Sequence, residues 1–179
     1  MILSLYDEPH GVVTGPGNRV VYDLDRGEAH AGSAAVEGRA LRWELEAEPS
    51  GEPLLSTEVA REGAEEWLLR CDRVDFPPGG LAYRHTHPGP GIRCLLAGSI
   101  EIETGGETHV YGPLEAWFEP GPEPVLARAS ATEPTAFVRV LLLPFEWAGK
   151  RTIRYVDPED AAKPKTQHAT VFLERPVTW

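Results

Sequence analysis

The sequence is poor in sulfur, in positive charge and in long apolar runs. Its 179 residues include one methionine and two cysteines, Cys71 and Cys94. Two thiols are too few for a disulfide framework or a thiolate zinc site, and such cysteines are most often small buried apolar groups. No apolar stretch approaches the ~20 residues that a membrane helix needs. Only 17 basic residues stand against 28 acidic ones, which gives a formal net charge of −11.

These shortages argue against several classes of function. An acidic chain repels phosphate backbones and anionic lipid surfaces, so we expect neither nucleic acid nor a membrane as a partner. Residues 1–11 meet acid and proline before a signal-peptide core can form, and we therefore expect a cytoplasmic protein. With 41% hydrophobic and 25% charged residues, the composition is typical of one globular domain spanning residues 1–179.

Long helices have no room in this sequence. Eighteen glycines and 17 prolines are spread along the chain and leave only short segments of helical composition, such as residues 64–68 and 158–163. Asp157, followed by Pro158 and two acids, is typical of a helix start. We expect any helix to be short.

Strand patterns, in contrast, are plentiful. In residues 41–48 apolar and charged residues alternate, which places Leu41, Trp43, Leu45 and Ala47 on one face of a half-buried strand. The Gly105-Gly106 pair predicts a hairpin between residues 99–103 and 107–111. Many short strands at this spacing predict a sandwich or barrel. Further strands are expected at residues 67–76, 92–96, 115–119, 125–129 and 137–143.

The two ends of the chain carry weaker patterns. Residues 1–40 hold short apolar pieces without a sustained period and are interpreted as an irregular, loop-rich lead-in. Residues 151–156 are interpreted as a last strand, within a short C-terminal tail of residues 151–179.

Chemistry is first suggested by His85 and His87. On an extended strand, alternate residues share a face, so both imidazoles and Tyr83 are expected to point the same way. Two convergent imidazoles are typical of a transition-metal site without identifying the metal. Surface or hydrogen-bonded histidines are the other interpretation of the pair.

The spacing around these histidines resembles the first motif of the cupin superfamily, G-x5-H-x-H-x3-E-x6-G. Gly79, His85, His87 and Gly98 match it, and residues 116–125 resemble the second motif. The resemblance covers residues 67–143. It implies an all-β, antiparallel jelly-roll barrel of about six to eight strands, here with an irregular N-terminal extension and a short C-terminal tail.

The sequence departs from the motif at two metal ligands. Gly91 stands where the family has a glutamate, and Val125 or Leu126 stands where it has a third histidine. The resemblance implies a divalent transition metal (Zn, Fe, Mn or Ni), for which the candidate ligands are His85, His87 and Glu119. His109, His30 and His10 are the remaining candidates for a further ligand.

A small-molecule site in the barrel is expected to include Tyr83, Trp117 and Arg93. An arginine that points inward would anchor a carboxylate through a bidentate pair. The strand-borne arginines among which the sequence does not choose are Arg84, Arg93, Arg128 and Arg139. Cys94 and His85 form a further alternative as a nucleophile and its base.

Two main functions follow from these patterns. In the first, the histidines, water and Glu119 hold a metal that activates dioxygen or a small oxygenated substrate, as in an oxygenase-like enzyme. In the second, a metal-free barrel binds a small carboxylated molecule without catalysis. A purely structural role is a third possibility. Because sheet edges need cover, we also expect a homodimer.

Overall fold

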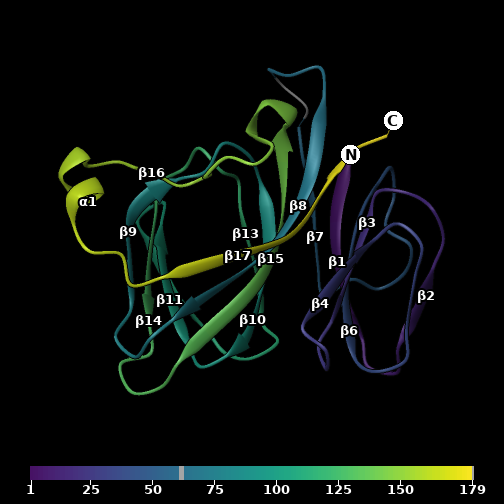
Figure 1. Cartoon of the computed structure of the whole chain (residues 1–179), viewed down its shortest axis with the longest axis horizontal. Helices are drawn as coiled ribbons and strands as arrows, with labels where there is room; N and C mark the ends of the chain where they lie inside the picture. Colours follow the sequence, from purple (N-terminus) through teal and green to yellow (C-terminus); the bar gives the residue numbers. More distant parts are fainter. Residues whose placement is uncertain (61–62, 179) are drawn as a thin grey trace.

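The computed structural model describes residues 1–60 and 63–178 and places most of them in antiparallel sheets (Figure 1). Three sheets have five strands each. The N-terminal sheet has the order β4 (Glu28–Ala31), β3 (Arg19–Asp23), β6 (Ala40–Glu46), β1 (Ile2–Glu8) and β7 (Leu55–Glu58). A two-stranded ribbon joins β2 (Val12–Thr14) to β5 (Ala34–Val36).

The other two sheets enclose the barrel. The central sheet has the order β13 (Ala116–Glu119), β10 (Gly91–Ala97), β15 (Thr135–Pro144), β8 (Trp67–Phe76) and β17 (His168–Pro176). The outer sheet has the order β12 (Glu107–Tyr111), β11 (Ile100–Thr104), β14 (Val125–Ala129), β9 (Leu81–Thr86) and β16 (Arg154–Tyr155). The helical elements described are a single 3₁₀ turn, η1 (Phe145–Trp147), and α1 (Pro158–Ala162).

The order of the barrel strands identifies their topology. Counted along the chain from β8 to β15, the sixth, third, eighth and first strands are neighbours in the central sheet. The fifth, fourth, seventh and second are neighbours in the outer sheet. This interleaving is the double Greek key of a jelly roll. The all-β jelly-roll prediction is confirmed.

Several local predictions are also confirmed. Strands β11 and β12 pair as a hairpin around Gly105-Gly106, and β6 buries Leu41, Trp43 and Leu45. Helix α1 begins after Asp157, whose Oδ1 accepts a hydrogen bond of 2.9 Å from the backbone N–H of Glu159. Residues 64–68 form no helix, because Trp67 already begins β8.

Both chain ends are more ordered than their sequences predict, and these expectations need correction. Residues 1–40 are not an irregular lead-in, because they contain β1 to β5 and the start of β6. In β1 four consecutive residues are buried. Leu3 and Leu5 pack in the core against the barrel, while on the other face Ser4 hydrogen-bonds Ser56 of β7 and the Arg42 guanidinium lies over the Tyr6 ring. Alternation is therefore lost. At the other end, residues 151–156 shrink to the two-residue β16, while β17 extends the central sheet.

The largest core lies between the N-terminal sheet and the central sheet. Trp43 is fully buried there, and its indole N–H donates to the carbonyl of Ile92 on β10 across 3.2 Å. Cys71 and Cys94 are free and buried in the same cluster, as the composition predicts. Burial raises the pKa of the Cys94 thiol to about 12, so it is unreactive at neutral pH.

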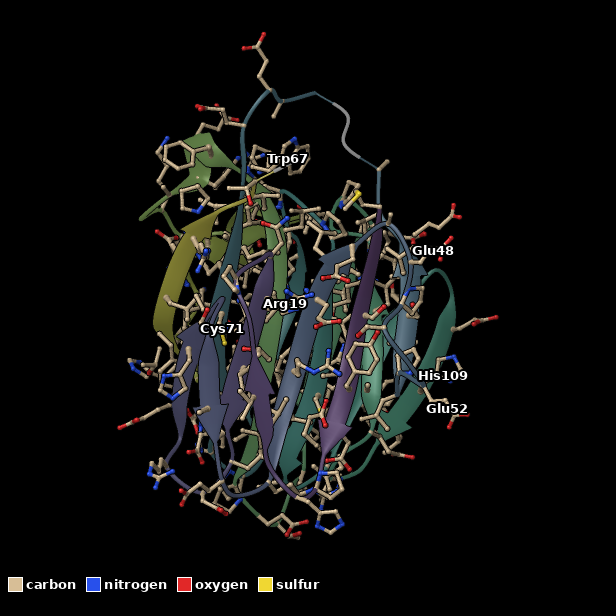
Figure 2. The ribbon with its side chains drawn as sticks, turned by 90° about the vertical axis from the view of Figure 1, so that its right-hand side faces the viewer. Arg19, Glu48, Glu52, Trp67, Cys71 and His109 are labelled. Carbon is tan, nitrogen blue, oxygen red and sulfur yellow. The ribbon has the colours of Figure 1, made fainter. Side chains whose placement is uncertain are left out.

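The opposite face of the N-terminal sheet is charged. Arg19, labelled in Figure 2, forms ion pairs with Glu44 and Glu46. A sheet with one apolar and one charged face has a single side to pack on the barrel. Within residues 1–60 and 63–178, no helix is long and apolar enough to cross a membrane.

Because Trp43 belongs to a core shared by two sheets, Trp43→Ala should destabilise the N-terminal sheet and barrel together. We expect the free energy of unfolding to fall by about 3–5 kcal/mol, in a single transition during urea denaturation. Val13→Ala, at a side chain that is 83% exposed, is the matched control and should change stability by less than about 0.5 kcal/mol. Two separate transitions would show that the layers fold independently.

Candidate functional site

A cavity of about 540 Å³ lies between the central and outer sheets. The barrel contributes an apolar and a polar part of its wall, and the chain beyond the barrel contributes a third part. The apolar part is formed by Val74, Phe76, Ala82, Ile102, Trp117, Val125, Ala127 and Phe137. The polar part is formed by Arg70, Asp72, His85, His87, Glu119 and Arg139. The third part comes from the chain beyond the barrel, at residues 149–153, 167–169, 171 and 174.

His85 and His87 line this cavity together. Both are buried, and their Nε2 atoms lie 3.2 Å apart. Tyr83 does not share their face. Val125 on β14 pairs with His85 but Ala127 pairs with Ala82, so β9 contains a bulge of one extra residue that changes the alternation. The Tyr83 ring instead lies outside the cavity, near the ammonium groups of Lys163 and Lys165.

The hydrogen bonds of the pair constrain its protons. Nδ1 of His85 lies 2.7 Å from the carbonyl of Tyr83, and a carbonyl only accepts, so Nδ1 carries the proton and the lone pair of neutral His85 is on Nε2. Nε2 of His87 faces this lone pair and also faces Nη1 of Arg139 at 3.3 Å. A guanidinium only donates, so His87 can donate to His85 or accept from Arg139, but not both.

Nδ1 of His87 has no hydrogen-bond partner among the described residues, and each protonation pattern of the two Nε2 atoms leaves one further group without a partner. If His87 donates to His85, an N–H of Arg139 lacks an acceptor; if His87 accepts from Arg139, the lone pair of His85 lacks a donor. An acidic ligand satisfies the first pattern and a hydroxyl the second. The Nη1 of Arg139 and the Nε2 of His85 therefore converge on the cavity, and one of them is always able to form a hydrogen bond with a ligand.

Both imidazoles are held neutral. Burial lowers the pKa of His85 and lowers that of His87 well below its usual value, and the nearby cations Arg139 and Arg93 lower the His87 pKa further. The site therefore offers imidazole, not imidazolium, at neutral pH.

Arg139 is fixed from the side away from the histidines. It lies opposite Asp72 in the β15–β8 register, and the Asp72 carboxylate accepts from Nε at 2.5 Å and from Nη2 at 3.2 Å. Nη1 remains directed at His87 and the cavity. Asp72 escaped the sequence analysis because an acid on a strand usually indicates a solvated face. The available signal was its alternation with the inward residues Val74 and Phe76.

Glu119 is buried, with both carboxylate oxygens engaged. Oε1 accepts from the indole N–H of Trp117 at 2.9 Å, and Oε2 lies 2.7 Å from Nη2 of Arg93. The same Oε2 is 3.9 Å from Nε2 of His87. Arg93 is fully buried behind the cavity wall, and burial lowers its pKa to about 10 although Glu119 opposes the shift. Of the three expected ligand-binding residues, only Trp117 lines the cavity.

Gly91 and Val125 stand where the cupin motifs have a glutamate and a third histidine. A Cβ on Gly91 would lie 2.6 Å from the carbonyl oxygen of Val140, so no glutamate fits there. Val125, not Leu126, faces the cavity beside His85. An apolar side chain therefore occupies the place of the third histidine.

These residues fit poorly to the metal that the cupin resemblance implies. Two histidines converge, but the guanidinium of Arg139 approaches the Nε2 that would bind the ion, and Glu119 is neutralised by Arg93. In the described part of the chain, no group of three or more histidine, cysteine or acidic side chains is arranged to hold a metal. A catalytic metal normally needs at least three protein ligands.

The remaining candidates lie away from the cavity. Arg84 and Arg128 pair with Glu103 on the outer sheet. Cys94 packs in the core between the N-terminal and central sheets, so it forms no dyad with His85. The three other candidate histidines, His10, His30 and His109, do not line the cavity.

The two glycines of the motif, Gly79 and Gly98, are required by the backbone conformation at their positions. Gly79 and Gly98 have φ of +71° and +74°, values that favour glycine, in the turns before β9 and after β10. Together with the jelly-roll strand order and the inward histidines, they determine the fold class. Residues 67–144 adopt the cupin fold.

Several solved structures are similar to part of this chain. The polyketide cyclase RemF from Streptomyces resistomycificus is 24% identical over 57% of this chain and 72% of that one, with a TM-score of 0.42. An RmlC-like cupin from Shewanella frigidimarina is 16% identical over 50% and 86% of the two chains, with a TM-score of 0.39. A cupin-like protein from Thermotoga maritima is 15% identical over 61% and 96%, with a TM-score of 0.39.

No family profile matches the chain, and no curated protein matches it. The chemistry of the cavity therefore rests on its own residues.

The lowered pKa values predict a pH-dependent stability. The unfolded chain binds protons at His85 and His87 below pH about 6.5, whereas in the folded chain both pKa values are lowered, so the free energy of unfolding should fall as pH drops from about 6.5 toward 5.5. Each buried histidine contributes up to about 1.4 kcal/mol per pH unit. Urea denaturation across this range should show a flatter dependence for His87→Gln. His109→Gln, at a side chain that is 59% exposed, should retain the wild-type slope, and an unchanged slope for His87→Gln would contradict the burial argument.

Proposed function

We propose that this protein binds a small acidic molecule with an apolar body in the cupin cavity, without a metal ion. The observation that carries the proposal is Arg139. Asp72 holds two of its nitrogens, and the third is directed into the cavity beside a neutral histidine. A guanidinium fixed in this way needs little reorganisation to bind a carboxylate or phenolate oxygen.

The charge of the cavity wall supports an acidic ligand. Arg70, Arg139, Lys150 and Arg151 stand against Asp72, Glu119 and Glu174, so cationic side chains outnumber acidic ones. In the chain as a whole, 28 acids stand against 17 bases. The cavity wall therefore carries a small excess of positive charge although the chain as a whole is negative, and this excess attracts anions locally.

The rest of the wall suits an apolar ligand body. Trp117 and Phe137 pack edge to face with ring centroids 5.3 Å apart, and both line the cavity with Phe76. Cavities of roughly 300–1,000 Å³ with mostly apolar walls and a few polar groups are typical of small-molecule sites. The volume of about 540 Å³ lies within this range.

The histidine pair supports an acid at the same point. When His87 donates to the Nε2 lone pair of His85, whose Nδ1–H is held by the carbonyl of Tyr83, the Nη1 of Arg139 is free for a ligand oxygen. A hydroxyl ligand would instead donate to the His85 lone pair while His87 accepts from Arg139. An acid and a hydroxyl thus use alternative protonation patterns of the same pair, and only the acid uses Arg139.

A metal-dependent enzyme is the second candidate. One specific observation favours it: the 3.2 Å between the two Nε2 atoms suits two ligands of one ion at about 2.1 Å each. The position of Arg139 disfavours it. The homodimer and the cytoplasmic location stay predictions.

If Arg139 anchors an acid, the aromatic acid 1-naphthoate should bind more tightly than the neutral 1-naphthalenemethanol in isothermal titration calorimetry. Arg139→Gln/Asp72→Asn removes both charges and leaves no buried ion unpaired, and should weaken 1-naphthoate by roughly 10–100-fold while leaving the alcohol nearly unchanged. Arg128→Gln on the outer sheet is the matched control. Equal affinity for the acid and the alcohol would overturn the assignment of Arg139.

Elemental analysis distinguishes the two candidate functions. We expect protein purified without chelator to contain far less than one metal per chain, because the ligand set is incomplete. Val125→His/Arg139→Gln/Asp72→Asn adds a histidine beside His85 and removes the guanidinium, and should gain the visible absorption of bound Co²⁺. Stoichiometric metal in the wild type that is lost in His85→Ala/His87→Ala would instead establish the metal-dependent candidate.

A further inference from the structure

The chain beyond the barrel forms one side of the cavity. The last barrel strand, β15, ends at Pro144, and the following residues return across the barrel as β17, drawn in yellow in Figure 1. We call residues 147–153 the strap. The cavity residues contributed by the strap are Gly149, Lys150, Arg151, Thr152 and Ile153, and those at β17 are Gln167, His168, Ala169, Val171 and Glu174. Without them the cavity would be open to solvent on this side.

One buried side chain holds the strap and β17 together. Arg70 lies on β8, the first barrel strand, and is only 2% exposed. Its Nη2 donates to the carbonyl of Trp147 at 2.7 Å and its Nη1 to the carbonyl of Lys150 at 2.8 Å. Its Nε donates to the Glu174 carboxylate at 2.6 Å. The same carboxylate accepts from the backbone N–H of Gly149 at 2.9 Å.

All these bonds of Arg70 end beyond the barrel. A buried guanidinium is costly unless its donors are satisfied, and here the strap and Glu174 supply every acceptor found in the described residues. Conversely, two strap carbonyls gain charge-assisted hydrogen bonds that a loop over a cavity would otherwise lack. The position of the strap and the burial of Arg70 therefore depend on each other.

The strap also carries charge to the cavity. Lys150 and Arg151 are two of the four cationic side chains in its wall, and both are exposed. The carbonyl that Arg70 binds belongs to Lys150 itself. Fixing this backbone fixes the positions in the cavity wall from which the two cationic side chains extend.

We propose that Arg70 is a positioning residue that holds the strap across the cavity, so that Lys150 and Arg151 form a cationic rim selecting acidic ligands. The selectivity part rests on the proposed function; the holding part does not. Two measurements therefore separate them.

The first measurement is hydrogen–deuterium exchange of the full chain without ligand. Arg70→Lys keeps the charge but can satisfy fewer of the three hydrogen bonds, and should speed exchange in residues 145–153 and 168–176 by at least about tenfold. Strands β11 and β12 should be unchanged. Glu174→Gln, at a side chain that is 24% exposed, tests the same contact with less risk to folding and should loosen the same segments. Arg73→Lys, whose partner Asp75 lies on its own strand, is the control.

The second measurement is the affinity ratio of 1-naphthoate to 1-naphthalenemethanol. We expect Arg70→Lys and Lys150→Gln/Arg151→Gln to lower this ratio by a similar factor, with the barrel intact by circular dichroism. If the wild type binds neither probe, the proposed function fails, while the exchange result still decides the holding role. Unchanged exchange in both Arg70→Lys and Glu174→Gln would overturn the proposal. An unchanged ratio despite faster exchange would overturn its selectivity part.

Discussion

The fold depends on how it neutralises charge inside a closed β barrel. Arg139 and Arg93 point inward from the central sheet, where an unpaired guanidinium would cost several kcal/mol. Each meets one carboxylate, Asp72 or Glu119, at ordinary hydrogen-bonding distance. Both pairs join neighbouring strands of the central sheet, and they hold the polar part of the barrel interior in one arrangement. Because Glu119 is used in this way, the barrel keeps a carboxylate near its histidines but does not leave it free for an ion.

The third layer explains why the central sheet can support so much polarity. Its far face packs on the N-terminal sheet, where the cluster around Trp43 and Ile92 buries apolar side chains from both layers. This cluster adds hydrophobic stabilisation from outside the barrel to that of the apolar cluster inside it, which includes Phe76 and Phe137. The added stabilisation offsets the cost of leaving a cavity and ionised groups in the interior. We regard the N-terminal sheet as the structural support that permits a polar site.

Residues that follow a simple rule were predictable from sequence, and residues that depend on tertiary context were not. Alternation located β6, the paired glycines located the β11–β12 hairpin, and spacing brought His85 and His87 to one face. Tyr83 was misplaced because the bulge in β9 depends on pairing with β14, which no local pattern records. β1 was missed because both of its faces are covered, and β17 because its partner β8 lies about 100 residues away in sequence.

The close packing around Gly91 limits which substitutions the barrel can accept at this position. Two independent obstacles, the carbonyl of Val140 and the side chain of Leu141, lie within 2.6 Å of any Cβ placed there. A single codon change that restored the acidic ligand would be blocked by backbone as well as by side chain. Nη1 of Arg93, which would lie 3.1 Å from the same Cβ, adds a third. Substitutions that move Leu141, Arg93 and the β15 backbone would have to precede an acidic residue at position 91. The packing around Gly91 therefore makes a return to the family's glutamate ligand difficult.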